Sequence, residues 1–416
     1  MTAREVAHAV LRRVFDEGAF TDRAFRAEAE RARLDPRDRA FAQQLAYGAV
    51  QRRASLDLLI AGLSSRPVQK LDPPVRDALR LGLLQLLFLD GVADHAAVSE
   101  SVDLAGRGGG LVNAVLRRAQ RERDALLGAL DDETPEAAAV MHSHPEWLVR
   151  MWWEQLGPDE TRALLRRDNE APESSVRINT LRTDGTLELP VPAHPAPDLP
   201  EGLVLEAPLD VHGTDAFERG ELMPQSRASM TVSRVLDPQP GERVLDLCAA
   251  PGAKTTHIAA LMEGRGEVVA VESHRGRARA LEENARRLGA ANVRVVVGDA
   301  AQPVGGEFDR VLLDPPCSDL GTLQSRPDVR WRKDPALIER VSAQQAALLD
   351  AAAVQVRPGG VLVYSTCTIS ARENEEQMAA FLSKHPDFAA TGDPVHLLPH
   401  RDGTDGFFIA RLERRA

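Results

Sequence analysis

The stretch ERVLDLCAAPGAKTT, residues 242–256, predicts the fold of the carboxyl-terminal part of the chain. Its beginning, RVLDL, is a short apolar run of the kind that forms a buried parallel strand. Pro251 and Gly252 mark a tight turn, and a helical pattern follows whose first threonines are expected to cap free N–H groups. A strand, a glycine turn and a helix form a nucleotide-type site at the carboxyl edge of an open α/β sheet. An ordinary turn in a non-catalytic α/β domain is the alternative.

Strands and helices alternate from residue 236 to the carboxyl terminus, which predicts an α/β domain with a parallel sheet over 236–416. Each of the first five predicted strands carries a polar or reactive residue at its carboxyl end, where open parallel sheets bind ligands. The further strands are expected at 268–273, 293–300, 308–317, 361–368 and 407–414, and helices at 277–289, 335–356 and within 371–385.

Residues 1–125 show apolar positions at helical spacing and no alternating strand pattern, so they predict a helical bundle. This segment holds 20 Lys and Arg against 17 Asp and Glu, whereas the whole chain has a net charge of −11. Arg117 and Arg118, near the glycine-rich 106–110, could form a basic rim. The asymmetry indicates a polyanionic partner, and a mixed solvated surface is the alternative.

Residues 126–235 are expected to be a connector and a small α/β subdomain. HPEWLVRMWWEQLG predicts an amphipathic helix whose tryptophans pack in a core, and SSVRINTL predicts a strand. The proline-rich LPVPAHPAPDLP, residues 189–200, is predicted to be a loop.

Composition excludes several classes of protein. No run of about 20 apolar residues occurs, and the first ten residues lack the apolar core of a signal peptide, so we expect a cytoplasmic protein without a membrane anchor. Three widely spaced cysteines argue against a disulfide framework, and their spacing matches no zinc motif, so no metal is expected.

Acidic residues at strand ends indicate the kind of ligand. Glu272 lies 20 residues after Gly252, a position from which an acid commonly binds ribose hydroxyls. Together with Asp246, Asp299 and Asp314, it suits a cationic, hydroxyl-bearing cofactor better than an anionic one. S-adenosylmethionine has these properties, because it carries a ribose and a sulfonium and no phosphate.

Two cysteines, Cys317 and Cys367, stand at the ends of the fourth and fifth predicted strands. In a doubly wound sheet these strands lie near the first one, so both thiols are expected to face the site. A free cysteine is often a small buried hydrophobe, which is the alternative for each of them and the preferred interpretation of Cys248.

The motifs LCAAPGAKT, LLDPPCS and YSTCTI, in this order, resemble the Nop/Sun family of RNA cytosine-5 methyltransferases. AREVAHAVL, RDRAFAQQLAYGAVQRR and LVNAVLRR resemble the NusB-like helical RNA-binding domain. The resemblance implies a Rossmann-like core with a mostly parallel seven-stranded sheet, S-adenosylmethionine as methyl donor, and a cytosine of 16S rRNA as acceptor. We also expect RNA as the partner, no membrane contact and a monomeric chain.

The resemblance implies a role for each matching residue. Cys367 matches the nucleophile that adds to carbon-6 of cytosine, and Cys317 the thiol that assists loss of the carbon-5 proton. Asp314 matches the acid that contacts the base. The cofactor-binding positions are Cys248, Ala249, Ala250, Pro251, Gly252, Ala253, Lys254, Glu272, Asp299 and Asp314.

One departure from the family pattern lies after Leu323, where Gln324 and Ser325 replace two arginines that would touch RNA or shape the cleft. Three other functions stay open. They are the same chemistry on another RNA such as tRNA, a non-catalytic RNA-binding or antitermination factor, and a small-molecule methyltransferase.

Overall fold

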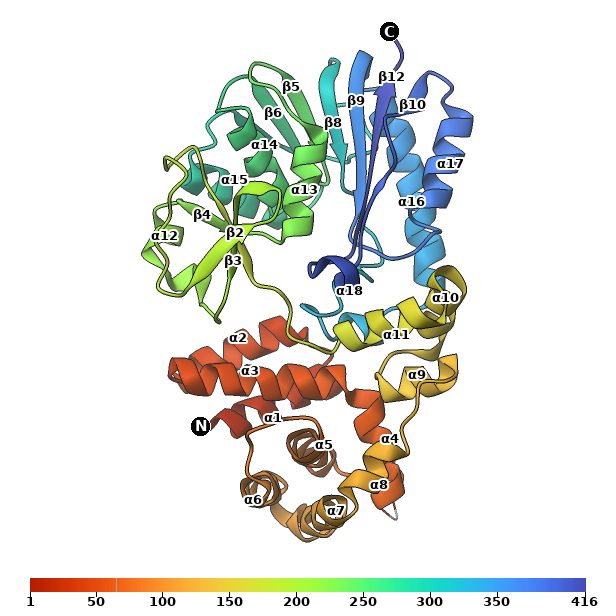
Figure 1. The fold of residues 1–416 in the computed structure, drawn as a ribbon. Helices are drawn as coiled ribbons and strands as arrows, with labels where there is room; N and C mark the ends of the chain where they lie inside the picture. Colours follow the sequence, from red (N-terminus) through yellow and green to blue (C-terminus); the bar gives the residue numbers. More distant parts are fainter. Residues whose placement is uncertain (65) are drawn as a thin grey trace. The chain divides into compact units, whose positions relative to one another are not determined.

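The computed structural model describes residues 1–64 and 66–416, which divide into two compact units. The helical unit contains Met1–Ala171 together with Leu323–Lys333, and the α/β unit contains Pro172–Thr322 and Asp334–Ala416 (Figure 1). The helical unit thus extends beyond residue 125, and the region predicted as 126–235 is divided between the two units. A segment from the carboxyl-terminal half of the sequence also belongs to the helical unit.

The helical unit confirms the prediction of an all-helical amino-terminal segment. Residues 37–63, which carry one continuous helical pattern, form two helices that meet at Arg52, and α2 was not singled out from the sequence. The helices are α1 Ala3–Asp16, α2 Thr21–Ala32, α3 Pro36–Gln51, α4 Arg53–Leu63, α5 Pro73–Leu87, α6 Asp94–Leu104, α7 Gly109–Arg121, α8 Arg123–Gly128, α9 Pro135–Met141, α10 Glu146–Leu156 and α11 Pro158–Arg167.

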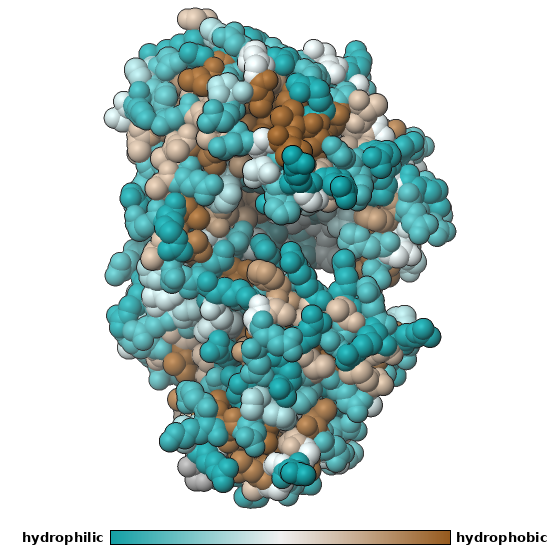
Figure 2. All heavy atoms as spheres, turned by 180° about the vertical axis from the view of Figure 1, so that it is seen from behind, coloured by the Kyte–Doolittle hydropathy of each residue, from teal (hydrophilic) through white to brown (hydrophobic). Residues whose placement is uncertain are grey.

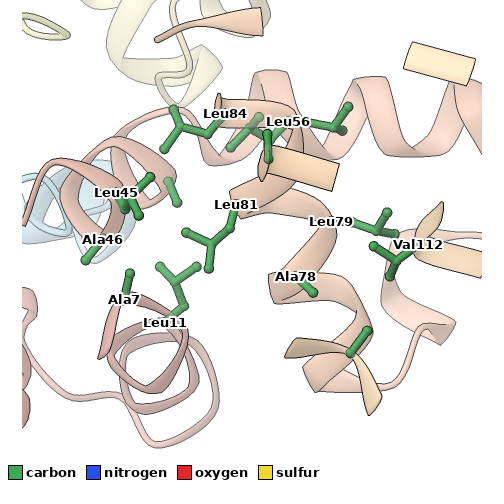
Figure 3. Close-up of a cluster of buried hydrophobic side chains, with 14 of the residues drawn as sticks. Ala7, Leu11, Leu45, Ala46, Leu56, Ala78, Leu79, Leu81, Leu84 and Val112 are labelled. Atoms are coloured by element: carbon green, nitrogen blue, oxygen red, sulfur yellow. The ribbon is translucent and has the colours of Figure 1, made fainter. Parts of the chain in front are cut away.

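The core of the helical unit forms around α5, whose central residues are buried on nearly every side. Leu81 and Leu84 of this helix lie with Leu45 of α3 and Leu11 of α1 in one apolar cluster (Figure 3). Because an isolated helix of this length is marginal in water, this packing is what stabilises the helices. Of the three tryptophans predicted to pack in a core, Trp152 of α10 is fully buried, whereas Trp147 and Trp153 are half-buried.

The inserted segment, Leu323–Lys333, is anchored in the helical unit by Arg330, which has no exposed surface. Its guanidinium donates to the carbonyl oxygens of Ser143 at 3.1 Å and Asp168 at 2.9 Å, and to Asn169 Oδ1 at 2.9 Å. A buried cation costs several kcal/mol unless its donors are satisfied. Both terminal nitrogens of Arg330 have acceptors and only its Nε lacks one, so these acceptors fix the segment.

The α/β unit begins with a small antiparallel sheet in the order β2-β3-β1-β4. The prediction of a loop over 189–200 is wrong, because these residues include β2 and the start of β3. Proline is tolerated there since β2 is an edge strand, and its pairing is irregular at Pro195. The elements are β1 Ser175–Ile178, β2 Ala193–Ala196, β3 Leu199–Leu205, α12 Asp215–Glu218, β4 Leu222–Pro224 and α13 Arg227–Leu236.

The large sheet has the order β10-β12-β9-β8-β5-β6-β7, and β11 pairs with β12. It therefore has eight strands rather than the predicted seven, because two short strands pair with β12. The five strands from β7 to β9 are parallel, as expected, and the others are antiparallel. The strands are β5 Arg243–Leu247, β6 Glu267–Glu272, β7 Val293–Val297, β8 Phe308–Leu313, β9 Val356–Thr366, β10 Phe388–Ala390, β11 Val395–Leu397 and β12 Phe407–Arg414.

Helices cover both faces of this sheet. Residues of α13 and α14 (Ala253–Leu261) pack with one set of strand side chains, and α15 (Arg275–Leu288) contributes to the same side. Residues of α16 (Pro335–Ala353) and α17 (Glu375–Lys384) pack with the other set. Burial on both faces accounts for the nearly continuous apolar runs in these strands.

The face of the molecule drawn in Figure 2 is mostly hydrophilic, and its hydrophobic residues gather in separate patches. Among the described residues, no helix has the length and apolar character needed to cross a membrane.

Candidate active site

The turn after β5 is shaped by two residues with positive φ. Cys248 has a φ of 64° and Gly252 a φ of 99°, and Gly252 caps the amino end of α14. Helix α15 holds the turn from outside, since Arg277 donates to the carbonyl of Ala250 at 2.9 Å and Asn284 to that of Pro251 at 3.0 Å. The predicted strand, glycine turn and helix are therefore confirmed.

The threonines after the turn act differently from the prediction. Neither caps a free N–H group, because Thr255 and Thr256 lie inside α14. Thr255 Oγ1 instead donates to the buried carboxylate of Asp246 at 2.6 Å, and Thr256 Oγ1 donates to the carbonyl of Gly252 at 2.7 Å. Asp246 is almost completely buried, and this burial raises its pKa to about 7.

Lys254 and Asp314 bring the turn and the end of β8 together. Lys254 Nζ lies 2.8 Å from Asp314 Oδ2, and Ser365 Oγ on β9 donates to Asp314 Oδ1 at 2.9 Å. The proximity and hydrogen bond of Asp314 raise the pKa of Lys254 although burial opposes this, so the ammonium stays charged. The ammonium of Lys254 thus orients the carboxylate of Asp314, which follows β8 between the ends of β5 and β9.

Glu272 and Asp299 lie at the carboxyl ends of β6 and β7, as predicted. The side chain of Glu272 is buried and accepts a hydrogen bond from the backbone N–H of His274 at 2.8 Å. Asp299 is exposed, and its carboxylate accepts from the backbone N–H of Ala301 at 3.0 Å. Each acid is held by the backbone two residues further along the chain.

The two cysteines expected to face the site lie in contact. Their Sγ atoms are 3.3 Å apart, and Asp319 Oδ1 lies 3.4 Å from Cys367 Sγ and 3.9 Å from Cys317 Sγ. The hydrogen bond to Cys317 raises the pKa of the Cys367 thiol well above its ordinary value, and burial and the carboxylates of Asp319 and Asp314 add to this. Cys367 is therefore a thiol at neutral pH and must lose its proton as it reacts.

A buried polar network supports both cysteines from behind. Glu373, which has no exposed surface, accepts from the N–H of Ser318 at 2.9 Å and from its hydroxyl at 2.6 Å. Ser318 Oγ also lies 2.6 Å from Thr368 Oγ1. Asn374 donates to the carbonyl of Thr368 at 3.0 Å and accepts from Thr366 Oγ1 at 2.5 Å. Ser318, next to Cys317, and Thr368, next to Cys367, are thus linked to each other and held by Glu373 and Asn374, which directly precede α17.

The loop that carries Cys317 also docks directly on the backbone beside Cys367. Gly321 donates its N–H to the carbonyl of Cys367 at 3.0 Å, and its carbonyl accepts from the N–H of Gly406 at 2.7 Å. A Cβ at Gly321 would meet the carbonyl oxygen of Gly406 at 2.0 Å, so glycine is needed for this approach.

Sequence reasoning missed Asp319, Glu373 and Asn374. The sequence signal for Asp319 is its place two residues after Cys317. In the structure its φ is 58°, a conformation that aspartate tolerates. Glu373 and Asn374 lie in a stretch that was interpreted only as part of a helix. The role of Glu373 depends on its contact with Ser318, 55 residues away in the sequence, whereas Asn374 contacts Thr366 and Thr368 nearby.

Two other sequence interpretations have clear outcomes. Cys248 packs against the large core, and burial raises the pKa of its thiol to about 12, which agrees with a packing role. Gln324 does not line a cleft, because it is buried in the helical unit, where its side chain donates to the carbonyl of Arg167 at 2.7 Å.

Three family models match successive parts of the chain. Residues 1–121 match the NusB family, 144–212 the ferredoxin-like domain of RsmF/B-like methyltransferases, and 233–413 the 16S rRNA methyltransferase RsmB/F family.

Curated relatives match over the full length. The chain is 38% identical to the probable ribosomal RNA small subunit methyltransferase B of Synechocystis sp., with all of both chains covered. It is 32% identical to the Bacillus subtilis protein of the same name, over 100% of this chain and 99% of the relative. With the Klebsiella pneumoniae ribosomal RNA small subunit methyltransferase B it shares 34% identity over 92% of each chain.

Solved structures support the fold. The crystal structure of PH0851 is similar over 100% of this chain and 99% of its own, with a TM-score of 0.81 and 29% identity. NSun6 from Pyrococcus horikoshii, solved with SFG, covers 65% of this chain and 98% of its own, with a TM-score of 0.59 and 26% identity.

Proposed function

Since this chain belongs to the family of ribosomal RNA small subunit methyltransferase B, we propose that it methylates carbon-5 of a cytosine in 16S rRNA through a covalent Cys367–cytosine adduct. The observation that carries this proposal is the pair of thiols, 3.3 Å apart, at the carboxyl ends of neighbouring parallel strands. A reaction that uses one thiol to form an adduct and another to resolve it needs this proximity.

S-adenosylmethionine is the cofactor, and the donor set at the strand ends fits it. Glu272 offers a carboxylate oxygen to the ribose hydroxyls, and Asp299 an exposed carboxylate next to it on the following strand. The turn 248–254 would hold the rest of the cofactor. The charge of Lys254 in this turn is already offset by its ion pair with Asp314. When bound, S-adenosylmethionine supplies the methyl group as an electrophilic sulfonium.

Cys367 is the proposed nucleophile. Its sulfur forms a bond to carbon-6 of cytosine, and its proton passes to Asp319, the carboxylate 3.4 Å from the sulfur. The addition makes carbon-5 electron-rich, which is what methylation of this poor nucleophile requires.

Asp314 is the proposed contact to the base. Each of its carboxylate oxygens already accepts one hydrogen bond, from Lys254 and Ser365, and keeps a further lone pair for the amino group of cytosine. The two existing bonds fix its orientation before the substrate arrives, so the base meets an acceptor that is already in position.

Cys317 is the proposed resolving thiol. Once carbon-5 carries the methyl group, Cys317 assists removal of the remaining carbon-5 proton, the ring double bond re-forms, and the bond to Cys367 breaks. The 3.3 Å between the two sulfurs supports this division of roles, because one base could contact both of them.

The test is the behaviour of two variants with labelled 16S rRNA on a denaturing gel. Cys367→Ala should be inactive and form no adduct. Cys317→Ala should transfer the methyl group and then accumulate a protein–RNA adduct, only when S-adenosylmethionine is present. An adduct from Cys367→Ala but not from Cys317→Ala would overturn the assignment, and no adduct from either would indicate that both thiols only pack.

Two rival functions are tested with the wild-type chain. Methylation of tRNA but not of 16S rRNA, mapped by bisulfite sequencing, would keep the chemistry and change the substrate. Binding of RNA without any cytosine methylation would favour a non-catalytic RNA-binding factor.

We further propose that the helical unit contributes RNA affinity, and that the chain acts as a monomer. On α7, Arg117 and Arg121 are exposed, whereas Arg118 is paired with Glu122 at 3.0 Å. Each lost phosphate contact reduces the salt dependence of RNA binding by about one unit. Arg117→Glu with Arg121→Glu should therefore weaken RNA binding and leave calorimetric cofactor binding unchanged, and an unaltered RNA affinity would remove α7 from the interface.

A further inference from the structure

We propose that Cys317, Cys367 and Asp319 form a binding site for a soft divalent cation of the Zn²⁺ type. One ligand atom from each residue lies within 4.8 Å of the other two. The spacing of cysteines along the chain predicted no metal site, because zinc motifs are defined by local spacing and these ligands come from two loops 50 residues apart.

The distances fit one ion. Zinc lies about 2.3 Å from a thiolate sulfur and about 2.0–2.2 Å from a carboxylate oxygen, so ligand atoms around a tetrahedral ion are roughly 3.5–3.8 Å apart. Here the two sulfurs are 3.3 Å apart, and Asp319 Oδ1 lies 3.4 Å and 3.9 Å from them. An ion can therefore be seated by shifts of a few tenths of an ångström.

The chemistry of the donors selects the class of cation. Two sulfurs and one carboxylate oxygen favour Zn²⁺ over Mg²⁺ or Ca²⁺, which prefer oxygen ligands alone. Binding releases one proton from each thiol to the solvent, so the metal holds both sulfurs as thiolates. The nearby charge of Lys254 is offset by Asp314 at 2.8 Å, which lowers the repulsion on an incoming cation.

The three protein ligands leave one coordination position for water, as in open zinc sites. The loops that carry the ligands are fixed by Glu373 and by the Gly321 contact, so the site needs little ordering when the ion binds. If the proposed function is correct, a bound cation occupies the sulfur that attacks cytosine, so metal and RNA adduct exclude each other. Binding of the cation itself does not depend on that function.

The test uses the full chain, reduced with a phosphine that does not bind metals, and Co²⁺ as a spectroscopic probe. Thiolate ligands to Co²⁺ give an intense charge-transfer absorption in the near ultraviolet. We expect this band to saturate at one Co²⁺ per chain and to disappear when Zn²⁺ displaces the cobalt.

Variants assign the ligands. Cys317→Ser and Cys367→Ser, which keep the size of the side chain, should each weaken Co²⁺ binding at least tenfold, and Asp319→Asn should weaken it while a sulfur band remains. Cys248→Ala is the control and should leave the cobalt titration unchanged. Circular dichroism verifies that each variant is folded.

A reduced wild-type chain without a charge-transfer band at millimolar Co²⁺ would overturn the proposal, as would loss of the band in Cys248→Ala. None of these measurements uses RNA or S-adenosylmethionine. Their failure is therefore distinguishable from failure of the adduct experiment.

Discussion

The two sides of the candidate site are built in different ways. On the carboxylate side, Glu272 and Asp299 are each held by a backbone N–H two residues later in the chain. On the sulfur side, the loops of Cys317 and Cys367 are joined through Glu373, which is 55 residues from Ser318. One side is thus ordered by local backbone geometry, and the other by buried contacts between distant parts of the sequence.

This difference indicates which side tolerates change. Glu272 is buried, but His274, whose N–H it accepts from, is exposed, and Asp299 is itself exposed. Water can therefore replace the contacts of either carboxylate when it is removed, with little effect on the fold. A buried donor that loses its acceptor has no such replacement and costs about 1–3 kcal/mol. Substitutions on the sulfur side should therefore reduce stability, and those on the carboxylate side should reduce ligand affinity.

The largest effect is expected from Glu373→Ala. It leaves both the N–H and the hydroxyl of Ser318 without their buried acceptor, and it opens a cavity, at a cost of about 3–5 kcal/mol. Thermal unfolding of the α/β unit in the full chain measures the loss. Glu375→Ala, an exposed acid two residues away, should change stability by less than about 0.5 kcal/mol. Equal effects of the two variants would show that the network does not support the site.

Glu272→Ala should behave in the opposite way. Loss of a charge-assisted hydrogen bond to the ribose should weaken cofactor binding by about 1.5–3 kcal/mol, while the melting temperature changes little. Calorimetry with S-adenosylmethionine measures the affinity. Glu267→Ala, at the other end of the same strand, is the matched control and should bind the cofactor normally. An unchanged affinity in Glu272→Ala would remove this residue from the site.

A smaller effect is expected on the reactivity of the Cys367 thiol when Cys317 is removed. The hydrogen bond to Cys317 raises the pKa of the Cys367 thiol, so Cys317→Ala should lower that pKa and increase the thiolate fraction at a given pH. A bond worth about 1 kcal/mol corresponds to roughly fivefold faster alkylation of Cys367 at pH 8. Iodoacetamide labelling followed by mass spectrometry over pH 7–10 measures the rate, and a slower reaction in the variant would contradict the assigned cause.

The carboxylate side was predictable from sequence because its signals are local. An apolar run that ends in an acid places Glu272, Asp299 and Asp314 at the strand ends, and the glycine turn identifies the edge of the sheet that binds ligands. The same patterns predicted the strands β5, β6, β7, β8, β9 and β12 and the helical character of the amino-terminal segment.

What sequence could not provide is pairing across long distances. Glu373 appears in the sequence as one acid among several in a helical pattern, and only the fold places it beneath Ser318. Similarly, the edge position of β2 is what makes its prolines acceptable, and no local pattern identifies an edge. Gln324 is expected at the RNA or the cleft only because the family has an arginine at this position, whereas the chain enters the helical unit at Leu323.

The insertion of Leu323–Lys333 into the helical unit has a consequence for synthesis on the ribosome. Arg330 and its acceptors, the carbonyls of Ser143 and Asp168, are separated by more than 160 residues. At roughly 5–20 residues per second, the acceptors wait about 8–30 s after Asp168 is translated before Arg330 follows. During this interval water must satisfy carbonyls that the arginine later covers. The amino-terminal helices are thus synthesised first, but the helical unit can reach its final packing only after Leu323–Lys333 has been translated.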